Sequence, residues 1–209
     1  MDRKGILLVV SGFSGAGKGT LMKELVSRYD NYALSISATT RSPREGEVDG
    51  REYFFRTKEE FEQMIADEAL IEHACYVGNY YGTPRAYVEE QLALGRDVIL
   101  EIEIQGALKI KKRFPDTLLL FVSTPDAETL KNRLIGRGTE SLDVVEKRLS
   151  RASEEAEGIE NYDYFIINDD LDTCVTQVHQ IIQGEHSRVS RNLELINTIK
   201  KDISKFQKG

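Results

Sequence analysis

The sequence predicts an α/β fold: a parallel sheet core with helices on both faces, an inserted α+β subdomain and a short lid. Short apolar runs that resemble buried strands alternate with stretches of helical period along the 209 residues, as in a sheet covered on both sides. A glycine-rich turn at residues 12–20 joins the first run to the first helix. Residues from about 34 to 96 interrupt the alternation, so we expect them to form the insert.

The core strands are predicted from four apolar runs, which are Ile6-Leu-Leu-Val-Val10, Val98–Ile104, Leu118-Leu-Leu-Phe-Val122 and Phe165-Ile-Ile167. The first helix follows Thr20 and carries an apolar stripe of Leu21, Leu25 and Val26. A second core helix separates the last two strands. It is expected to start at Thr124-Pro125, with threonine as the N-cap and proline as the first helical residue.

The insert is expected to contain short antiparallel strands and two helices. The strand signals are Ser35-Ile-Ser37, Tyr53-Phe-Phe55 and Tyr76–Tyr81, together with a turn at Asp49-Gly50. One helix begins at the capping box Thr57-x-x-Glu60. The other is expected to run from Thr83-Pro84 to Gly95.

Two further segments stand apart from the core. Gly136-Arg-Gly-Thr-Glu-Ser141 lies between two helical stretches and is interpreted as part of a lid, with a plain surface loop as the alternative. Residues 185–209 hold six Lys or Arg and three Asp or Glu. Their apolar positions recur every three or four residues and predict an amphipathic helix: Val189, Leu193, Ile196, Ile199, Ile203 and Phe206. The stripe must pack on the domain or on another copy of the chain; membrane contact is disfavoured because basic and acidic residues are mixed.

Composition limits the classes of function. The chain has 28 Lys and Arg against 35 Asp and Glu, a net charge of −7, which argues against nucleic acid and membrane surfaces as partners. No apolar run is long enough to span a bilayer, and no secretory segment follows Met1. Cys75 and Cys174 do not form a disulfide framework, so we expect reduced thiols and a cytoplasmic location. The three histidines lack the spacing of metal ligands.

Residues 12–20 carry the most specific chemical signal. They match the P-loop pattern after a strand and before a helix, where backbone N–H groups, the helix N-terminus and a lysine together bind phosphate. The strict pattern places Ser or Thr directly after the lysine, but here Gly19 intervenes. Mg²⁺ ligation by the next hydroxyl is therefore left open, with ATP phosphates and water as the main ligands. The expected ATP-binding residues are Gly12, Phe13, Ser14, Gly15, Ala16, Gly17, Lys18, Gly19 and Thr20.

A second group of charged residues indicates an acceptor site. Arg41 and Arg44 lie three residues apart on a loop stiffened by Pro43, which suits bidentate capture of another phosphate. A solvated loop is the alternative, and a P-loop in the same domain favours the phosphate site. Glu101 and Glu103 are expected to lie on one strand and to point the same way at the mouth of the site; solvated glutamates on an edge strand are the alternative.

From about Gly5 to Gly184 the chain closely resembles guanylate kinase. The matching blocks, in order, are Gly12–Thr20, Ser37–Tyr53, Ile71-Glu72, Gly78–Thr83, Leu100–Gly106 and Gly136–Thr139. The resemblance implies transfer of the γ-phosphoryl group of ATP to GMP, and to dGMP, with Mg²⁺, in purine nucleotide metabolism. It implies a domain at 5–184, with the core at 5–33 and 97–184, the GMP-binding insert at about 34–96 and the lid at about 136–150. Residues 185–209 lie beyond it as a helical extension that offers a route to homo-oligomers.

The resemblance also implies roles on the GMP side. Arg41, Arg44, Tyr53 and Tyr81 would hold the GMP phosphate, and Glu47 would orient the arginines. Glu72 would accept hydrogen bonds from guanine N1–H and the 2-amino group, while Ser37 and Thr83 address other edge atoms including O6. Glu101 and Glu103 would face GMP, Arg41 or metal-bound water. Many relatives have serine where this chain has Thr83, and aspartate where it has Glu103.

On the ATP side, the resemblance implies that Arg133, Arg137 and Arg148 contact ATP phosphates and that Asn168 belongs to the adenine-side loop. Lys18, Arg41, Arg137 and Arg148 are the expected catalytic residues. The main alternative is a guanylate-kinase-like protein-interaction module without catalysis. A kinase for a different small acceptor is the second alternative, which Arg41, Glu72 and Tyr81 disfavour.

Overall fold

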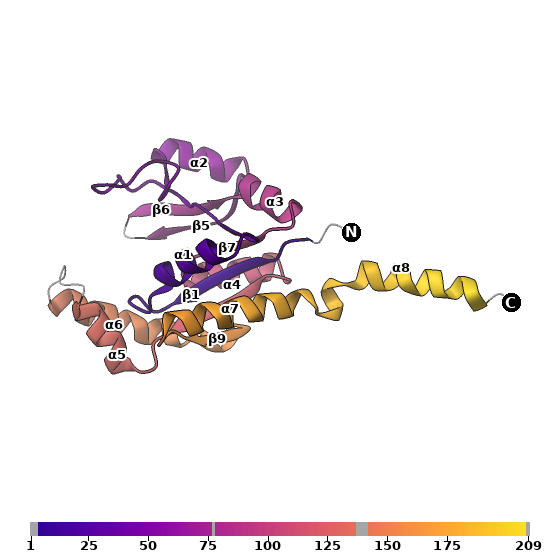
Figure 1. Ribbon diagram of the computed structural model, residues 1–209. Helices are drawn as coiled ribbons and strands as arrows, with labels where there is room; N and C mark the ends of the chain where they lie inside the picture. Colours follow the sequence, from indigo (N-terminus) through magenta and orange to yellow (C-terminus); the bar gives the residue numbers. More distant parts are fainter. Residues whose placement is uncertain (1–3, 77, 137–141, 208–209) are drawn as a thin grey trace.

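The computed structural model describes residues 4–76, 78–136 and 142–207 and contains two sheets (Figure 1). The larger has five strands in the order β2-β7-β1-β8-β9, and every neighbouring pair in it is parallel. The predicted α/β class with a parallel core is confirmed. The strands are β1 (Leu7–Gly12), β2 (Tyr32–Leu34), β7 (Asp97–Glu101), β8 (Leu118–Ser123) and β9 (Tyr164–Ile167).

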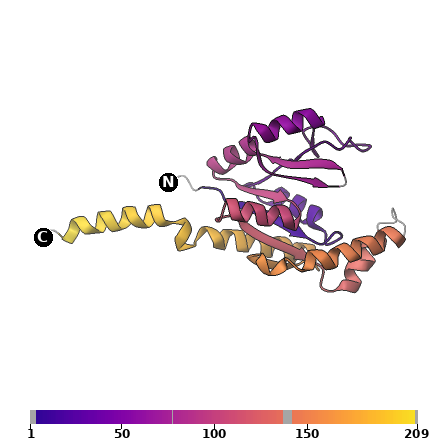
Figure 2. The same ribbon diagram turned by 180° about the vertical axis from the view of Figure 1, so that it is seen from behind.

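Helices cover both faces of this sheet (Figures 1 and 2). On one face, α1 (Lys18–Arg28) and α7 (Leu171–His186) pack against Leu8 and Val10 of the central strand. On the other, α3 (Arg85–Ala93) and α4 (Ile104–Arg113) pack against Val9. Because successive side chains of a strand point to opposite faces, both faces need apolar residues and the strand becomes a continuous apolar run.

The inserted segment forms its own four-stranded sheet in the order β4-β3-β6-β5. Its elements are β3 (Ala38–Thr39), β4 (Phe54–Phe55), α2 (Lys58–Ala66), β5 (Leu70–Tyr76) and β6 (Asn79–Pro84). A small core of Ala38, Phe61 and Leu70 lies beneath α2. The predicted capping box of α2 is confirmed, since Thr57 Oγ1 accepts from the Glu60 amide and Glu60 Oε2 accepts from the Thr57 amide.

Two expectations for the insert need correction. The pairs β3–β6 and β5–β6 are antiparallel as expected, but β3–β4 is parallel. The long loop between β3 and β4 carries the chain back across the sheet, which permits a parallel pair. The second helix, α3, buries Val88 against the core sheet rather than in the insert, so it covers the core although the chain reaches it through the insert.

Two element boundaries in the core also differ from the sequence expectation. The strand expected to extend to Ile104 ends at Glu101, and Glu103 is the N-cap of α4. Residues from Ile104 onward have helical period, with Ala107 and Ile110 facing the core. After β8, α5 (Ala127–Gly136) begins three residues later than Thr124. Asp126 makes the capping bond, because its carboxylate accepts from the Thr129 amide at 2.6 Å.

The carboxyl-terminal part begins with helix α6 (Leu142–Ala156), the short turn η1 (Ile159–Asn161) and β9. After α7 the chain continues as η2 (Val189–Arg191), α8 (Leu193–Ser204) and η3 (Lys205–Gln207). Helix α8 projects away from the body (Figures 1 and 2). Most of its apolar side chains are exposed, so the stripe as a whole is not packed on the same domain in this structure. The exposed residues are Leu193, Leu195, Ile199 and Ile203, with Phe206 beyond the helix, whereas Ile196 is half-buried. None of the helices in the described ranges is long and apolar enough to cross a membrane.

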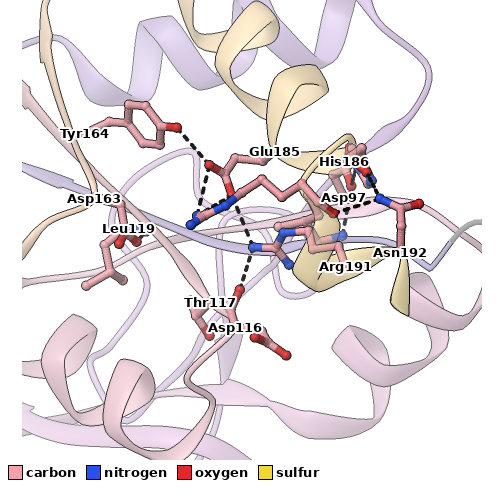
Figure 3. A network of polar contacts seen from close by, with 12 residues as sticks. Asp97, Asp116, Thr117, Leu119, Asp163, Tyr164, Glu185, His186, Arg191 and Asn192 are labelled. Atoms are coloured by element: carbon pink, nitrogen blue, oxygen red, sulfur yellow. Dashed lines mark hydrogen bonds and ion pairs between the residues drawn. The ribbon is translucent and has the colours of Figure 1, made fainter. Parts of the chain in front are cut away.

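A polar network fixes the point where α8 leaves the body (Figure 3). The carboxylate of Glu185 is buried and accepts from the Tyr164 hydroxyl at 2.8 Å, with Arg188 and Arg191 beside it. His186 Nε2 lies 2.7 Å from the buried carboxylate of Asp97 at the start of β7. The Asn192 side chain donates to the His186 carbonyl at 2.8 Å. The first residues of the extension, 185–192, are therefore part of the folded body.

Candidate active site

The P-loop lies between β1 and α1, at the carboxyl edge of the core sheet. Gly12, Gly15 and Gly17 have φ values of +152°, +95° and +87°, which side chains other than glycine adopt rarely. Space is also limiting, because a Cβ at Gly12 would lie 2.0 Å from the Val122 carbonyl oxygen. Helix α1 has no side-chain cap and no acidic residue in its first turn. The amino-terminal end of α1 therefore keeps the positive partial charge that favours an anion.

Lys18 bends back over this loop. Its Nζ donates to the Gly12 carbonyl at 2.7 Å and to the Phe13 carbonyl at 3.2 Å. The ammonium group therefore already lies over the loop that the motif assigns to phosphate. Thr20, whose hydroxyl was left open as a metal ligand, is exposed in the first turn of α1.

The residues expected on the ATP side meet the P-loop from two directions. Arg148 of α6 donates to the Ser14 hydroxyl at 3.1 Å. Arg133 of α5 donates to the Asn168 carbonyl at 2.9 Å, and the Asn168 side chain donates to the Ala16 carbonyl at 2.8 Å. Arg137 lies outside the described residues. Three of the four residues expected on the ATP side therefore lie at the loop: Arg133, Arg148 and Asn168. They come from a stretch of sequence in which Arg133 and Asn168 are 35 residues apart.

A second cluster is built on the loop between β3 and β4. Arg41 Nη2 donates to Glu47 Oε1 at 2.9 Å, and the Arg44 amide donates to Glu47 Oε2 at 2.7 Å. These bonds hold the pKa of Glu47 below its ordinary value. The Arg41 guanidinium lies 5.3 Å from the centre of the Tyr53 ring, and the rings of Tyr53 and Tyr81 are 6.1 Å apart. Glu47 thus bonds both the Arg41 guanidinium and the Arg44 backbone, and it lies in one cluster with the tyrosines expected to bind the GMP phosphate.

The residue expected to read the base is held by its neighbours. Thr83 is fully buried and its hydroxyl donates to Glu72 Oε1 at 2.9 Å. A Cβ at Gly106 would lie 3.4 Å from Glu72 Oε2, so the carboxylate rests against the start of α4. Burial raises the pKa of Glu72, while the Thr83 bond and Lys109 act in the opposite direction. Ser37, at the start of β3, is half-buried, and its carbonyl accepts from the Phe54 amide.

The two glutamates expected on one strand lie on different elements. Glu101 ends β7, and a Cβ at Gly19 would lie 3.9 Å from its Oε2. Glu101 as a whole residue is exposed, but the surrounding protein partly desolvates its carboxylate, and this desolvation raises its pKa. The charges of Lys18 and Lys23 act in the opposite direction. Glu103 caps α4 and is exposed. The expectation that both glutamates point the same way from one strand is therefore wrong. Glu101 lies beside Gly19 of the P-loop.

Two residues near the site were not singled out in the sequence. Lys109 acts on the Glu72 carboxylate from α4; its spacing three residues after Gly106 is a helical signal that could have drawn attention to it. Tyr162 packs on Phe121, and burial raises its pKa to about 12. It lies between η1 and β9, and no local sequence pattern distinguishes it from a core tyrosine.

Comparison with known proteins gives one consistent family. The family model described as guanylate kinase matches residues 4–185. A guanylate kinase from Bacillus cereus is 53% identical over 191 residues, covering 91% of this chain and 93% of the relative. One from Lactococcus lactis is 48% identical over 194 residues, covering 93% and 95%. The crystal structure of guanylate kinase from Anaplasma phagocytophilum is similar with a TM-score of 0.73 and 30% identity, over 90% of this chain and 89% of that one.

Proposed function

The chain belongs to the guanylate kinase family, and from that premise we propose that it transfers the γ-phosphoryl group of ATP to GMP, and to dGMP, in purine nucleotide metabolism. The observation that supports the proposal is two separate groups of residues whose chemistry suits anions. One is the P-loop with Lys18, and the other is the Arg41–Glu47 cluster with its tyrosines. A non-catalytic interaction module has no need of both, and none of the comparisons favours it.

The chemistry asks for positioning and charge neutralisation. An oxygen of the GMP phosphate attacks the γ-phosphorus in line, a new P–O bond forms, and the bond to the ADP oxygen breaks. No general base is required, because that oxygen is already ionised at neutral pH. In this proposal Lys18, Arg137 and Arg148 stabilise charge on the transferring group and on ADP, and Arg41 with Arg44, Tyr53 and Tyr81 holds the acceptor phosphate.

Base selection is assigned to Glu72. An ionised carboxylate has only acceptors, and guanine offers two adjacent donors, N1–H and the 2-amino group. The Thr83 hydroxyl supports this role because it occupies one side of the carboxylate and limits its rotation. Ser37 and Thr83 are proposed for the remaining edge of the base. Adenine would leave the carboxylate unpaired, which is costly in a partly buried site.

The proposed cofactor is Mg²⁺. Within the described residues, no group of three or more His, Cys, Asp or Glu side chains could hold a metal ion without other ligands. The available oxygen donors fit an ion bound mainly through ATP phosphates and water: the Thr20 hydroxyl at the start of α1, and Glu101 beside Gly19. When bound, Mg²⁺ would neutralise charge on the ATP phosphates.

We also propose a division of the chain, a compartment and an assembly. Residues 5–184 would form the kinase domain, with the insert at about 34–96 and the lid at about 136–150, and residues 185–209 an extension. Two free cysteines, Cys75 exposed and Cys174 buried, support a reducing cytoplasm. The exposed apolar stripe of α8 supports self-association, because side chains at three- and four-residue spacing bury well against a second copy of the same helix.

The test is release of ADP from ATP and Mg²⁺ in a coupled assay with GMP, dGMP, AMP, CMP or UMP as acceptor. The proposal expects turnover with GMP and dGMP and little with the other three. Nucleotide binding without turnover on any acceptor would favour the interaction module. Turnover mainly on AMP, CMP or UMP would favour a kinase with a different acceptor.

A further inference from the structure

Asn168 sits at the carboxyl end of β9 and is only 5% exposed. Its backbone amide donates to the Ser123 carbonyl at 2.8 Å, which ties it to β8. Its side-chain amide donates to the Ala16 carbonyl at 2.8 Å, and its backbone carbonyl accepts from the Arg133 side chain at 2.9 Å. One buried residue therefore connects the rigid sheet, the P-loop and an arginine of α5.

The contact with the loop is steric as well as polar. A Cβ at Gly17 would lie 2.6 Å from Asn168 Nδ2, and Gly17 has a φ of +87°. In a trans peptide the carbonyl and the N–H point in opposite directions. Holding the Ala16 carbonyl toward Asn168 therefore aims the Gly17 N–H the other way. The orientation of this N–H is what a P-loop uses to bind phosphate oxygens.

We propose that Asn168 is a positioning residue for the triphosphate: it fixes the Ala16–Gly17 peptide of the P-loop and the place of Arg133. This inference rests on the proposed function. One N–H of the Asn168 side-chain amide is committed to the Ala16 carbonyl in a buried environment. Through this bond the residue acts on ATP by way of the loop.

The test compares Asn168→Ala with Asn192→Ala. Both variants remove a side-chain amide that donates to a backbone carbonyl at 2.8 Å. Asn192, however, lies in the polar network where α8 leaves the body (Figure 3). The measurements are KM for ATP and for GMP, and the Kd for ADP by calorimetry. For Asn168→Ala we expect KM for ATP and Kd for ADP to rise about tenfold, or about 1.4 kcal/mol, with KM for GMP changed less than about twofold. Asn192→Ala should leave all three unchanged.

Three results would overturn the inference: an unchanged Kd for ADP in folded Asn168→Ala, equal rises in KM for both substrates, or the same ADP effect in Asn192→Ala. Circular dichroism checks folding, and Asn168→Asp, which has the same shape but no donor, serves as a second variant. If the wild-type chain forms no GDP, the proposed function fails. The Kd for ADP then still decides the role of Asn168.

Discussion

Glu72 illustrates how one residue can serve binding at a cost to folding. In the proposed base selection its charged form accepts two hydrogen bonds from guanine, yet burial raises its pKa and so disfavours that form. Thr83 reduces the conflict by donating to the carboxylate, and Lys109 reduces it through charge. Lys18 presents no such conflict, since its ammonium lies over the loop, where the proposed mechanism uses its charge.

Glu72→Gln keeps the shape of the side chain and replaces one acceptor with a donor. We expect KM for GMP to rise and the GMP/AMP ratio of kcat/KM to fall by about 1–3 kcal/mol, or about five- to 150-fold, with little effect on KM for ATP. Steady-state kinetics with both acceptors measures the ratio. If the ratio stays within about twofold of wild type, Glu72 does not read the base, and Ser37 and Thr83 become the leading candidates.

Glu72→Gln is expected to stabilise the fold although it impairs the use of GMP. A group whose pKa is raised in the folded state stabilises the fold below its unfolded pKa, and that contribution is lost as the pH rises through the folded pKa. At neutral pH we therefore expect Glu72→Gln, without nucleotide, to have a higher Tm than wild type, with the difference shrinking in acid. Glu47, whose pKa is lowered, serves as a control of opposite sign, so Glu47→Gln should lower the Tm at neutral pH. A lower Tm for Glu72→Gln at neutral pH would show that burial does not dominate.

Lys18→Ala removes the charge over the P-loop. We expect kcat/KM to fall about a hundredfold or more, since losing one such donor typically costs about 3 kcal/mol in the transition state. The fold should persist, because Lys18 is only half-buried and its ammonium donates to the Gly12 and Phe13 carbonyls of its own loop. Kinetics and circular dichroism measure both effects. A near-normal rate in the folded variant would remove Lys18 from the mechanism.

At the scale of elements, much of the site could be predicted, because its motifs sit where strands end. The P-loop and the α2 capping box depend on residues three to eight apart, and such local patterns are visible in a sequence. The predicted position of Glu103 on the strand was wrong. Leu100, Ile102 and Ile104 alternate with the glutamates and so continue a strand pattern, although the strand ends at Glu101 and α4 follows Glu103. The start of α5 was predicted at Thr124-Pro125, because threonine and proline are favourable there. The bond from the Thr129 amide to the Asp126 carboxylate, which the sequence pattern does not reveal, places the cap at Asp126.

Helix α8 gives the prediction at this scale. A chain ending at Asn192 keeps the network of Glu185, His186 and Asn192 (Figure 3), whereas one ending at Gly184 would remove it. We expect the full chain to sediment as an oligomer and the chain ending at Asn192 as a monomer, because only α8 and η3 are lost. Ile203→Asp should also dissociate the oligomer. Thr198→Asp adds the same charge on the other side of the helix and should not. Identical monomers throughout would end the proposal of self-association.

At the scale of the whole molecule, the two sheets carry different groups of the candidate site. The parallel sheet presents the P-loop at its carboxyl edge, and the smaller sheet carries Glu72 and Thr83 with the loop of Arg41 beside it. Long-range contacts such as Arg148 with Ser14, 134 residues apart, have no signature in a single sequence, so only the family resemblance could indicate them. In the proposed mechanism the two phosphates are held on separate units, so that phosphoryl transfer requires both substrates and transfer to water is limited.

The most direct measurement of the central claim is phosphorus NMR of ATP, GMP and Mg²⁺ with the purified chain. The account predicts GDP and ADP in equal amounts, no inorganic phosphate above background, and negligible ADP when GMP is omitted. ADP formed together with inorganic phosphate, or no GDP from a chain that binds both nucleotides, would contradict it.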